Sequence, residues 1–95
     1  MAGRKKVATL APRVVPASEI TGVRLAPVIS SNVEAAGYMP ELGRLVIRYQ
    51  GGSVYVYYRV PAAIWVEFQA AQSKGQYLAQ CVKGNPMYAA ARVAV

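Results

Sequence analysis

The residues best suited to binding chemistry are arginines and tyrosines that alternate in and beside one stretch, residues 45–61. They are Arg44, Arg48, Arg59, Tyr55 and Tyr57. Guanidinium groups bind phosphates, and tyrosine rings form platforms on which unstacked bases lie. In small sheets, however, tyrosines usually pack in the core, and arginines often only line a solvated edge. The stretch predicts a nucleic-acid surface if both residue types share a face.

Further cations extend this predicted surface. Lys74 and Lys83 flank the second predicted helix, and Arg4, Lys5 and Lys6 form a basic cluster near the N-terminus. A basic cluster is a general contact for phosphates, and it also serves simply to keep a chain soluble. The net charge of the whole chain, +7, favours a polyanionic partner.

The sequence argues against catalysis and against a metal or cofactor. It has no histidine, the commonest general base and metal ligand. The four glutamates are scattered, and Cys81 lies on a helical stripe where core packing is the usual role. No glycine-rich loop of phosphate-binding form is present. We therefore expect a non-enzymatic protein with no cofactor.

The element that must position the arginines and tyrosines is a β-hairpin, strand 44–50 followed by strand 53–60. A two-residue loop, Gly51-Gly52, gives the cleaner alternation, with one apolar face and one face that carries the arginines, Tyr55 and Tyr57. A three-residue loop, Gly51-Gly52-Ser53, turns both tyrosines to the apolar face. The residues alone leave both registers open.

The rest of the chain predicts an α+β domain, a three-stranded antiparallel β-meander with two short helices packed on one face. The expected first strand is Asn32–Tyr38, and the expected helices are Pro61–Gln72 and Gln76–Val82. Residues 1–26 show no sustained periodicity and are predicted to be a basic, flexible arm. Residues 27–88 are the predicted domain, and 89–95 a small apolar tail.

Several short motifs resemble one family. They are Ser30-Ser31-Asn32, Gly37-Tyr38, Leu45-x-Ile47-x-Tyr49, Tyr55-x-Tyr57, Val60-Pro61 and Ser73-Lys74-Gly75-x-Tyr77. Together, over about residues 28–88, they are similar to the KTSC domain. That family is named for the C-terminus of some lysyl-tRNA synthetases and includes small bacterial and phage proteins. The resemblance implies RNA binding as a suggested activity, and tyrosines that face the helices. The basic arm and the alanine-rich end depart from the family.

Two functional hypotheses follow. The leading one is a non-catalytic accessory module that binds nucleic acid, RNA or single-stranded DNA, in the cytoplasm of a bacterial host. The competing one is a protein-interaction or oligomerisation module, such as a phage-encoded modulator of a host protein complex. Hydrophobic residues make up 55% of the chain, which favours an interface with a second copy or a host protein. Such a homo-oligomer is expected through the uncovered sheet face, with Val46, Val54 and Val56 or with Tyr55 and Tyr57, through the sheet edge, or through residues 87–95. No apolar run reaches the ~18 residues of a membrane span, so no membrane partner is expected.

Overall fold

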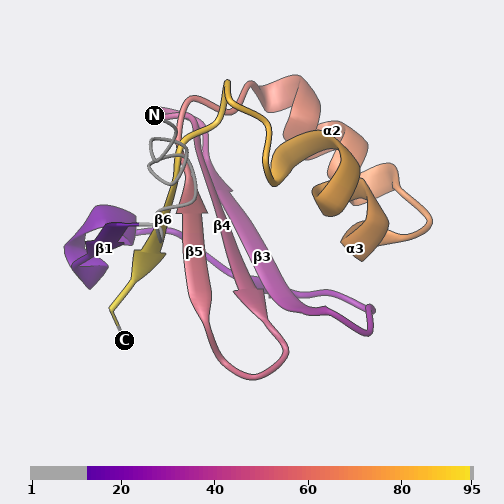
Figure 1. The fold of residues 1–95 in the computed structure, drawn as a ribbon, viewed down its shortest axis with the longest axis horizontal. Coiled ribbons are helices and arrows are strands. Elements are labelled where there is room, and N and C mark those ends of the chain that lie inside the picture. The colour runs from indigo at the N-terminus through magenta and orange to yellow at the C-terminus, as the bar shows by residue number, and fades with distance from the viewer. Residues whose placement is uncertain (1–12, 95) are drawn as a thin grey trace, which may run out of the picture.

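The computed structural model describes residues 13–94, which form a six-stranded mixed sheet with the helices on one side (Figure 1). The strands are β1 (Arg13–Val15), β2 (Ala26–Pro27), β3 (Val33–Met39), β4 (Arg44–Tyr49), β5 (Val54–Tyr57) and β6 (Ala90–Val93). They lie in the order β1-β6-β5-β4-β3-β2, and only β1 and β6 pair in parallel. The predicted α+β class is therefore correct, but the sheet is larger than a three-stranded meander.

The helical elements are short and follow β5, apart from one turn near the start of the described chain. A 3₁₀ turn, η1 (Ala17–Ile20), follows β1. The helix α2 (Ala62–Ala70) is followed by α3 (Lys74–Tyr77), which continues as the π-helical turn η2 (Leu78–Val82). Within residues 13–94, no helix is long and apolar enough to cross a membrane.

The hairpin takes a three-residue loop, so the two-residue register is wrong. Tyr49 N donates to Ser53 O at 2.9 Å, and Ile47 pairs with Tyr55 across the strands. The loop is Gln50-Gly51-Gly52, one residue earlier than the alternative predicted, and its glycines have φ of 101° and 99°. Tyr55 and Tyr57 consequently share a face with Leu45, Ile47 and Tyr49. The cleaner alternation favoured the wrong register because both sides of this sheet are covered, so both sides carry apolar residues.

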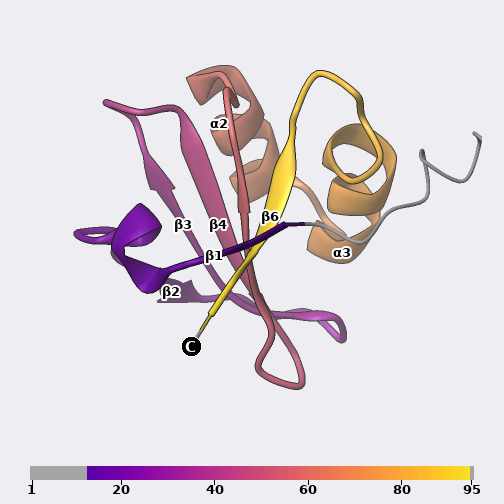
Figure 2. The ribbon, with the colours of Figure 1, turned by 60° about the vertical axis from the view of Figure 1, so that its left-hand side comes forward.

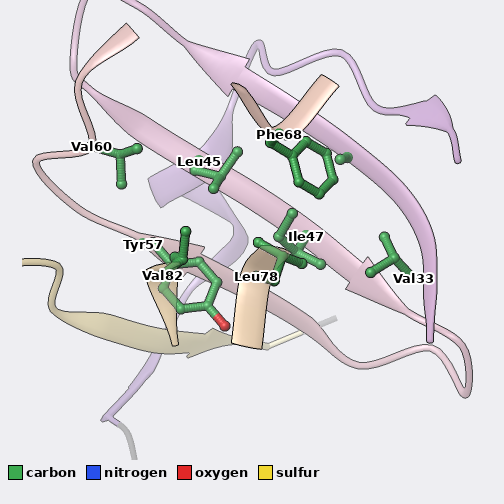
Figure 3. Packing of buried hydrophobic residues seen from close by; sticks show 9 residues of the cluster. Val33, Leu45, Ile47, Tyr57, Val60, Phe68, Leu78 and Val82 are labelled. Carbon is green, nitrogen blue, oxygen red and sulfur yellow. The ribbon is translucent and has the colours of Figure 1, made fainter. Parts of the chain in front are cut away.

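The helix side of the sheet holds the larger core (Figure 3). Leu45 and Ile47 of β4 pack there with Phe68 of α2 and with Leu78 and Val82 of η2. Trp65 is only partly buried, and its ring lies 5.8 Å, centroid to centroid, from both Tyr38 and Phe68. These contacts fix the two helices on the sheet as predicted.

The junction between the helices differs from the prediction. Residues 73–75 lie between the two predicted helices, but in the structure they begin the second one. The Ser73 hydroxyl accepts a hydrogen bond from Gln76 N at 3.3 Å, which caps α3. Gly75 lies inside α3 and does not have a positive φ, so it does not end a helix. A serine cap thus decides where the second helix begins.

The second side of the sheet is covered by the chain itself, which corrects the predicted arm and tail (Figure 2). Val46, Val54 and Val56 are buried there beside Val15 of β1 and Ala91 and Val93 of β6, the added strands of the sheet. Ile20, Val23 and Leu25, which follow β1 in the chain, pack against this cluster. Residues 13–27 and 90–93 therefore belong to the packed domain, because they complete the sheet and its second core. The surfaces assigned to a homo-oligomer are largely used within one chain, and oligomerisation stays a prediction.

Gly37 fixes how closely the covering segment approaches the sheet. A Cβ added at Gly37 would overlap the carbonyl oxygen of Arg24 and lie 3.0 Å from a methyl carbon of Val23. The backbone of the segment therefore rests directly on β3 at a residue that has no side chain. Any larger residue would push the segment away from the second core.

Candidate functional site

A hollow of about 470 Å³, here called the tyrosine pocket, opens on the helix side beside the end of η2. Tyr49, Tyr55, Tyr57 and Lys83 line it. The Tyr49 and Tyr57 hydroxyl oxygens are 2.8 Å apart, and the Tyr49 and Tyr55 rings meet edge to face with centroids 5.8 Å apart. The Lys83 ammonium lies 5.5 Å from the centre of the Tyr49 ring. The pocket thus combines aromatic surface with a cation.

The two paired hydroxyls make the pocket a hydrogen-bond donor. Burial raises the pKa of Tyr57, and the hydrogen bond with Tyr49 raises it further. Burial also raises the pKa of Tyr49. Both groups therefore keep their protons at neutral pH. Because two hydroxyls share one hydrogen bond, one O–H remains to donate to a ligand oxygen.

Three further hollows form a row with the tyrosine pocket. Two of them share lining residues with it, and the third shares lining residues with one of those two. One of about 330 Å³ shares Ser53 with it and includes Arg92. One of about 400 Å³ shares Tyr49 and Lys83 with it. The last, of about 360 Å³, shares Ser31, Asn32 and Gly75 with the third hollow and includes Lys74. We call these four hollows together the tyrosine track.

Cations lie along the whole track. Arg92 stands directly opposite Tyr55 in the pairing of β5 with β6, so both side chains share the helix side. Lys83 follows at the tyrosine pocket, and Lys74, whose ammonium donates to Ala71 O at 2.7 Å, lies at the far end. Among the carboxylates of residues 13–94, none is within 4.0 Å of these three cations. Their charge is available to an anionic ligand.

Two of the sequence motifs meet at the Lys74 end of the track. The Ser30 hydroxyl accepts hydrogen bonds from Asn32 N at 3.1 Å and Val33 N at 3.2 Å, which forms a compact turn. This turn rests on α3, because a Cβ added at Gly75 would lie 3.0 Å from Asn32 Nδ2. Motifs that are distant in sequence therefore build one continuous surface.

The structure separates the predicted arginines from the predicted tyrosines. Arg44 and Arg48 alternate with Leu45 and Ile47 along β4 and so lie on the second side. Arg48 Nε is 3.5 Å from a Glu34 carboxylate oxygen. The prediction that arginines and tyrosines share one surface is therefore wrong, because it depended on the two-residue loop. Of the predicted binding residues, the track brings together Tyr55, Tyr57, Lys74 and Lys83.

The remaining predicted residues lie elsewhere. Arg44 and Arg59 line a separate hollow of about 450 Å³ together with Arg13 and Tyr58; we call it the arginine hollow. Arg4, Lys5 and Lys6 lie outside the described residues. Cys81 is half-buried beside the helix-side core, in keeping with a packing role.

Sequence reasoning missed two residues of the track. Tyr49 was recognised only as part of the Leu45-x-Ile47-x-Tyr49 motif, although its hydroxyl reaches Tyr57 and its ring lies near the Lys83 ammonium. Arg92 was placed in a tail without structure. Ala91-Arg92-Val93 alternates apolar and charged residues as a strand does, but three residues are too few for that pattern to be recognised.

The fold and the track define a small α+β domain whose sequence motifs gather on one side, and comparison with known proteins assigns its family. A model of the KTSC domain matches residues 29–88, and the chain belongs to the KTSC domain family. The crystal structure of a KTSC domain protein from Yersinia pestis is similar with a TM-score of 0.72 and 27% identity, over 77% of this chain and all of that one.

Two sequence relatives place the domain in different contexts. A protein of Tsukamurella paurometabola is 44% identical over 57 residues, which is 60% of this chain and 85% of that protein. A lysine–tRNA ligase of a Nostoc species is 36% identical over 58 residues, 61% of this chain but 10% of the ligase. The family match omits β1, η1, β2 and β6, which lie outside residues 29–88.

Proposed function

We propose that the tyrosine track binds single-stranded nucleic acid, RNA or DNA, and that the protein is a non-catalytic accessory module. One observation carries this proposal: a row of hollows that share lining residues brings tyrosine rings together with cations at both ends and in the middle, and no carboxylate of residues 13–94 pairs with these cations. Single strands are bound by this combination, because every base has a face that stacks and every nucleotide a phosphate that attracts cations.

Each part of the track has a distinct role in this proposal. Tyr55 offers its ring to a base, and the free hydroxyl proton of the Tyr49–Tyr57 pair donates to a base carbonyl or a phosphate oxygen. Lys83 and Arg92, on either side of Tyr55, neutralise the flanking phosphates. Lys74 extends the contact by a further phosphate. None of these roles needs base-specific readout.

RNA is the favoured polymer. The matched segment of the Nostoc protein belongs to a ligase whose name gives it a tRNA to act on. A segment that helps such an enzyme to hold its substrate would contact RNA, and the same segment as a separate small protein would keep that capacity. This argument concerns the relative's context and adds to the charge and shape of the track.

Fluorescence anisotropy with labelled dodecamers of uridine and of thymidine, titrated at several salt concentrations, tests the proposal. Lys83→Gln should lower the slope of log affinity against log salt by about 0.7, the value for one phosphate contact on a single strand. Tyr55→Ala should leave the slope unchanged and weaken binding at every salt concentration by about 1–3 kcal/mol, the usual value of one stacked base.

Arg48→Gln is the matched control, because Arg48 is paired with Glu34 on the second side of the sheet. It changes the net charge by the same amount as Lys83→Gln and should leave both slope and affinity close to those of the wild type. A variant with Arg4, Lys5 and Lys6 changed to Gln measures any contribution of the N-terminal cluster. If that variant abolishes binding while Lys83→Gln and Tyr55→Ala bind like wild type, the track is not the binding site.

A further inference from the structure

We propose that the arginine hollow binds an acidic peptide segment of a partner protein, with an apolar side chain of that peptide seated among the arginines. This interaction is separate from nucleic-acid binding, because the hollow lies on the second side of the sheet. Its lining comes from β1, η1, the β3–β4 turn, the start of β4, the two residues after β5 and the segment before β6. The tyrosine track shares none of these lining residues.

The base of the hollow is held by a network around Glu19. An Arg44 guanidinium nitrogen donates to the Glu19 carbonyl oxygen at 2.6 Å and lies 3.7 Å from its carboxylate. The Tyr58 hydroxyl donates to the same carboxylate at 2.8 Å. The Arg44 guanidinium carbon lies 5.2 Å from the centre of the Tyr58 ring. Glu19, the one acidic residue of the hollow, is therefore already satisfied, and Arg44 and Tyr58 are fixed in place.

Two further arginines leave the hollow with an excess of positive charge. Arg13 and Arg59 both line it, and among residues 13–94 neither has a carboxylate within 4.0 Å. Arg59 has φ of 60°. Among residues 13–94 it is the one residue other than glycine that takes a left-handed conformation. Arg59 lies two residues beyond β5, and strained residues of this kind cluster at binding sites. An anionic partner complements this charge.

Exposed apolar side chains make a peptide a better partner than a phosphate chain. Leu42 and Met87 line the hollow from different loops and are 53% and 71% exposed. A nucleic-acid backbone offers nothing to cover them, whereas a leucine or phenylalanine next to a carboxylate would. Tyrosine, methionine and arginine are also the residues enriched at protein interfaces. The hollow thus fits an acidic peptide with an apolar residue.

A fluorescein-labelled dodecapeptide of aspartate, glutamate and leucine tests this, by titration and by ¹H–¹⁵N chemical-shift mapping of the full-length protein. The shifts should centre on Leu42, Tyr58 and Met87. Arg59→Asn, which tolerates the left-handed conformation, and Arg13→Gln should each weaken binding about two- to fivefold, the range of an exposed ion pair. Arg92→Gln removes the same charge from the track and is the matched control, with no expected change.

Two comparisons separate the peptide from other ligands. Met87→Ser should weaken the leucine peptide severalfold and leave a peptide with serine in place of leucine unaffected. Equal binding of the leucine and serine peptides would overturn the proposal, because the hollow would then sense charge alone. A second result would also overturn it. If Arg59→Asn and Arg13→Gln bound the peptide normally but no longer bound the uridine dodecamer, the hollow would be a nucleic-acid site. If the track variants bound the dodecamer like the wild type, the proposed nucleic-acid function would be wrong, but the peptide proposal for the hollow would stand.

Discussion

The tyrosine track and the arginine hollow lie on opposite sides of one sheet and differ in their origin. The track contains most residues of the motifs that mark the family, from Ser30 to Gly75, and these lie within residues 29–88. The hollow contains no motif residue, and Arg13 and Glu19 come from outside the family match. One end of the track, with Arg92, also lies outside the match, so the matched segment accounts for the tyrosines, Lys74 and Lys83 but not for the whole track.

The two regions also use charge differently. Along the track, lysines and an arginine stand beside neutral tyrosines, and no carboxylate of the described residues pairs with them. In the hollow, Glu19 holds Arg44 and Tyr58 and leaves the surplus charge to Arg13 and Arg59. An internal acid that orders part of a basic cluster favours a shaped ligand, whereas unpaired cations in a row favour a flexible polyanion.

Gly37→Ala should have the largest effect and should alter the hollow more than the track, because it displaces the segment that completes the hollow. The new Cβ overlaps the carbonyl of Arg24, so either the segment or β3 must move. Overpacking of this kind costs about 1–3 kcal/mol. We expect chemical denaturation to show that loss, with the amide signals of Glu19 and Tyr58 shifted further than those of Tyr55 and Lys83. Equal shifts in both regions would mean that the two sides of the sheet are not independent.

The helix side was largely predictable from local pattern. The strand residues of β3 and β4, the proline before α2 and the apolar positions Phe68, Leu78 and Val82 all follow from propensity and spacing. The register was not, because it depends on Gln50 joining the two glycines in the loop. A shift of one residue moved Tyr55 and Tyr57 to the other face, and with them the predicted binding surface.

The second side was not predictable, for a different reason. β1 has three residues and β6 four, too few for an alternation to be recognised. Each is also stabilised by pairing with the other across almost the whole length of the chain. Such pairing is a property of the folded domain and leaves no local sign. Arg13 and Glu19 therefore looked like residues of a flexible arm, and the arginine hollow was not foreseen.

Arg59→Gly should change the stability of the protein less than Gly37→Ala does, and in the opposite direction. A left-handed conformation costs a residue with a Cβ about 1–2 kcal/mol, and glycine removes that cost. Glycine also has a larger entropy in the unfolded state, which offsets part of the gain in stability. We expect a net stabilisation of up to about 1 kcal/mol in urea denaturation, together with weaker binding of the acidic peptide. Gln72→Gly, at an exposed position, is a control for the entropy of added glycine. Destabilisation by Arg59→Gly would show that the guanidinium contributes to the fold.

The smallest effect concerns the tyrosine hydroxyls of the two regions at high pH. The pKa of Tyr57 is raised by burial and by its tyrosine neighbours, so the folded protein keeps this proton well above pH 10, where the unfolded chain loses it. The unfolded state then binds fewer protons, and stability falls as the pH rises above 10. Tyr58 also has a raised pKa through burial and Glu19, but Arg44 and Arg13 oppose that rise.

Tyr57→Phe removes one such group and should therefore lose less stability than the wild type between pH 8 and pH 10.5, by about 0.5–1 kcal/mol. Tyr58→Phe should give a smaller difference, because nearby guanidinium groups stabilise its phenolate. Urea denaturation at the two pH values measures both. Equal differences for the two variants would mean that the Tyr49–Tyr57 pair is as open to solvent and charge as Tyr58. The track would then lose the buried hydroxyl donor that distinguishes it from the hollow.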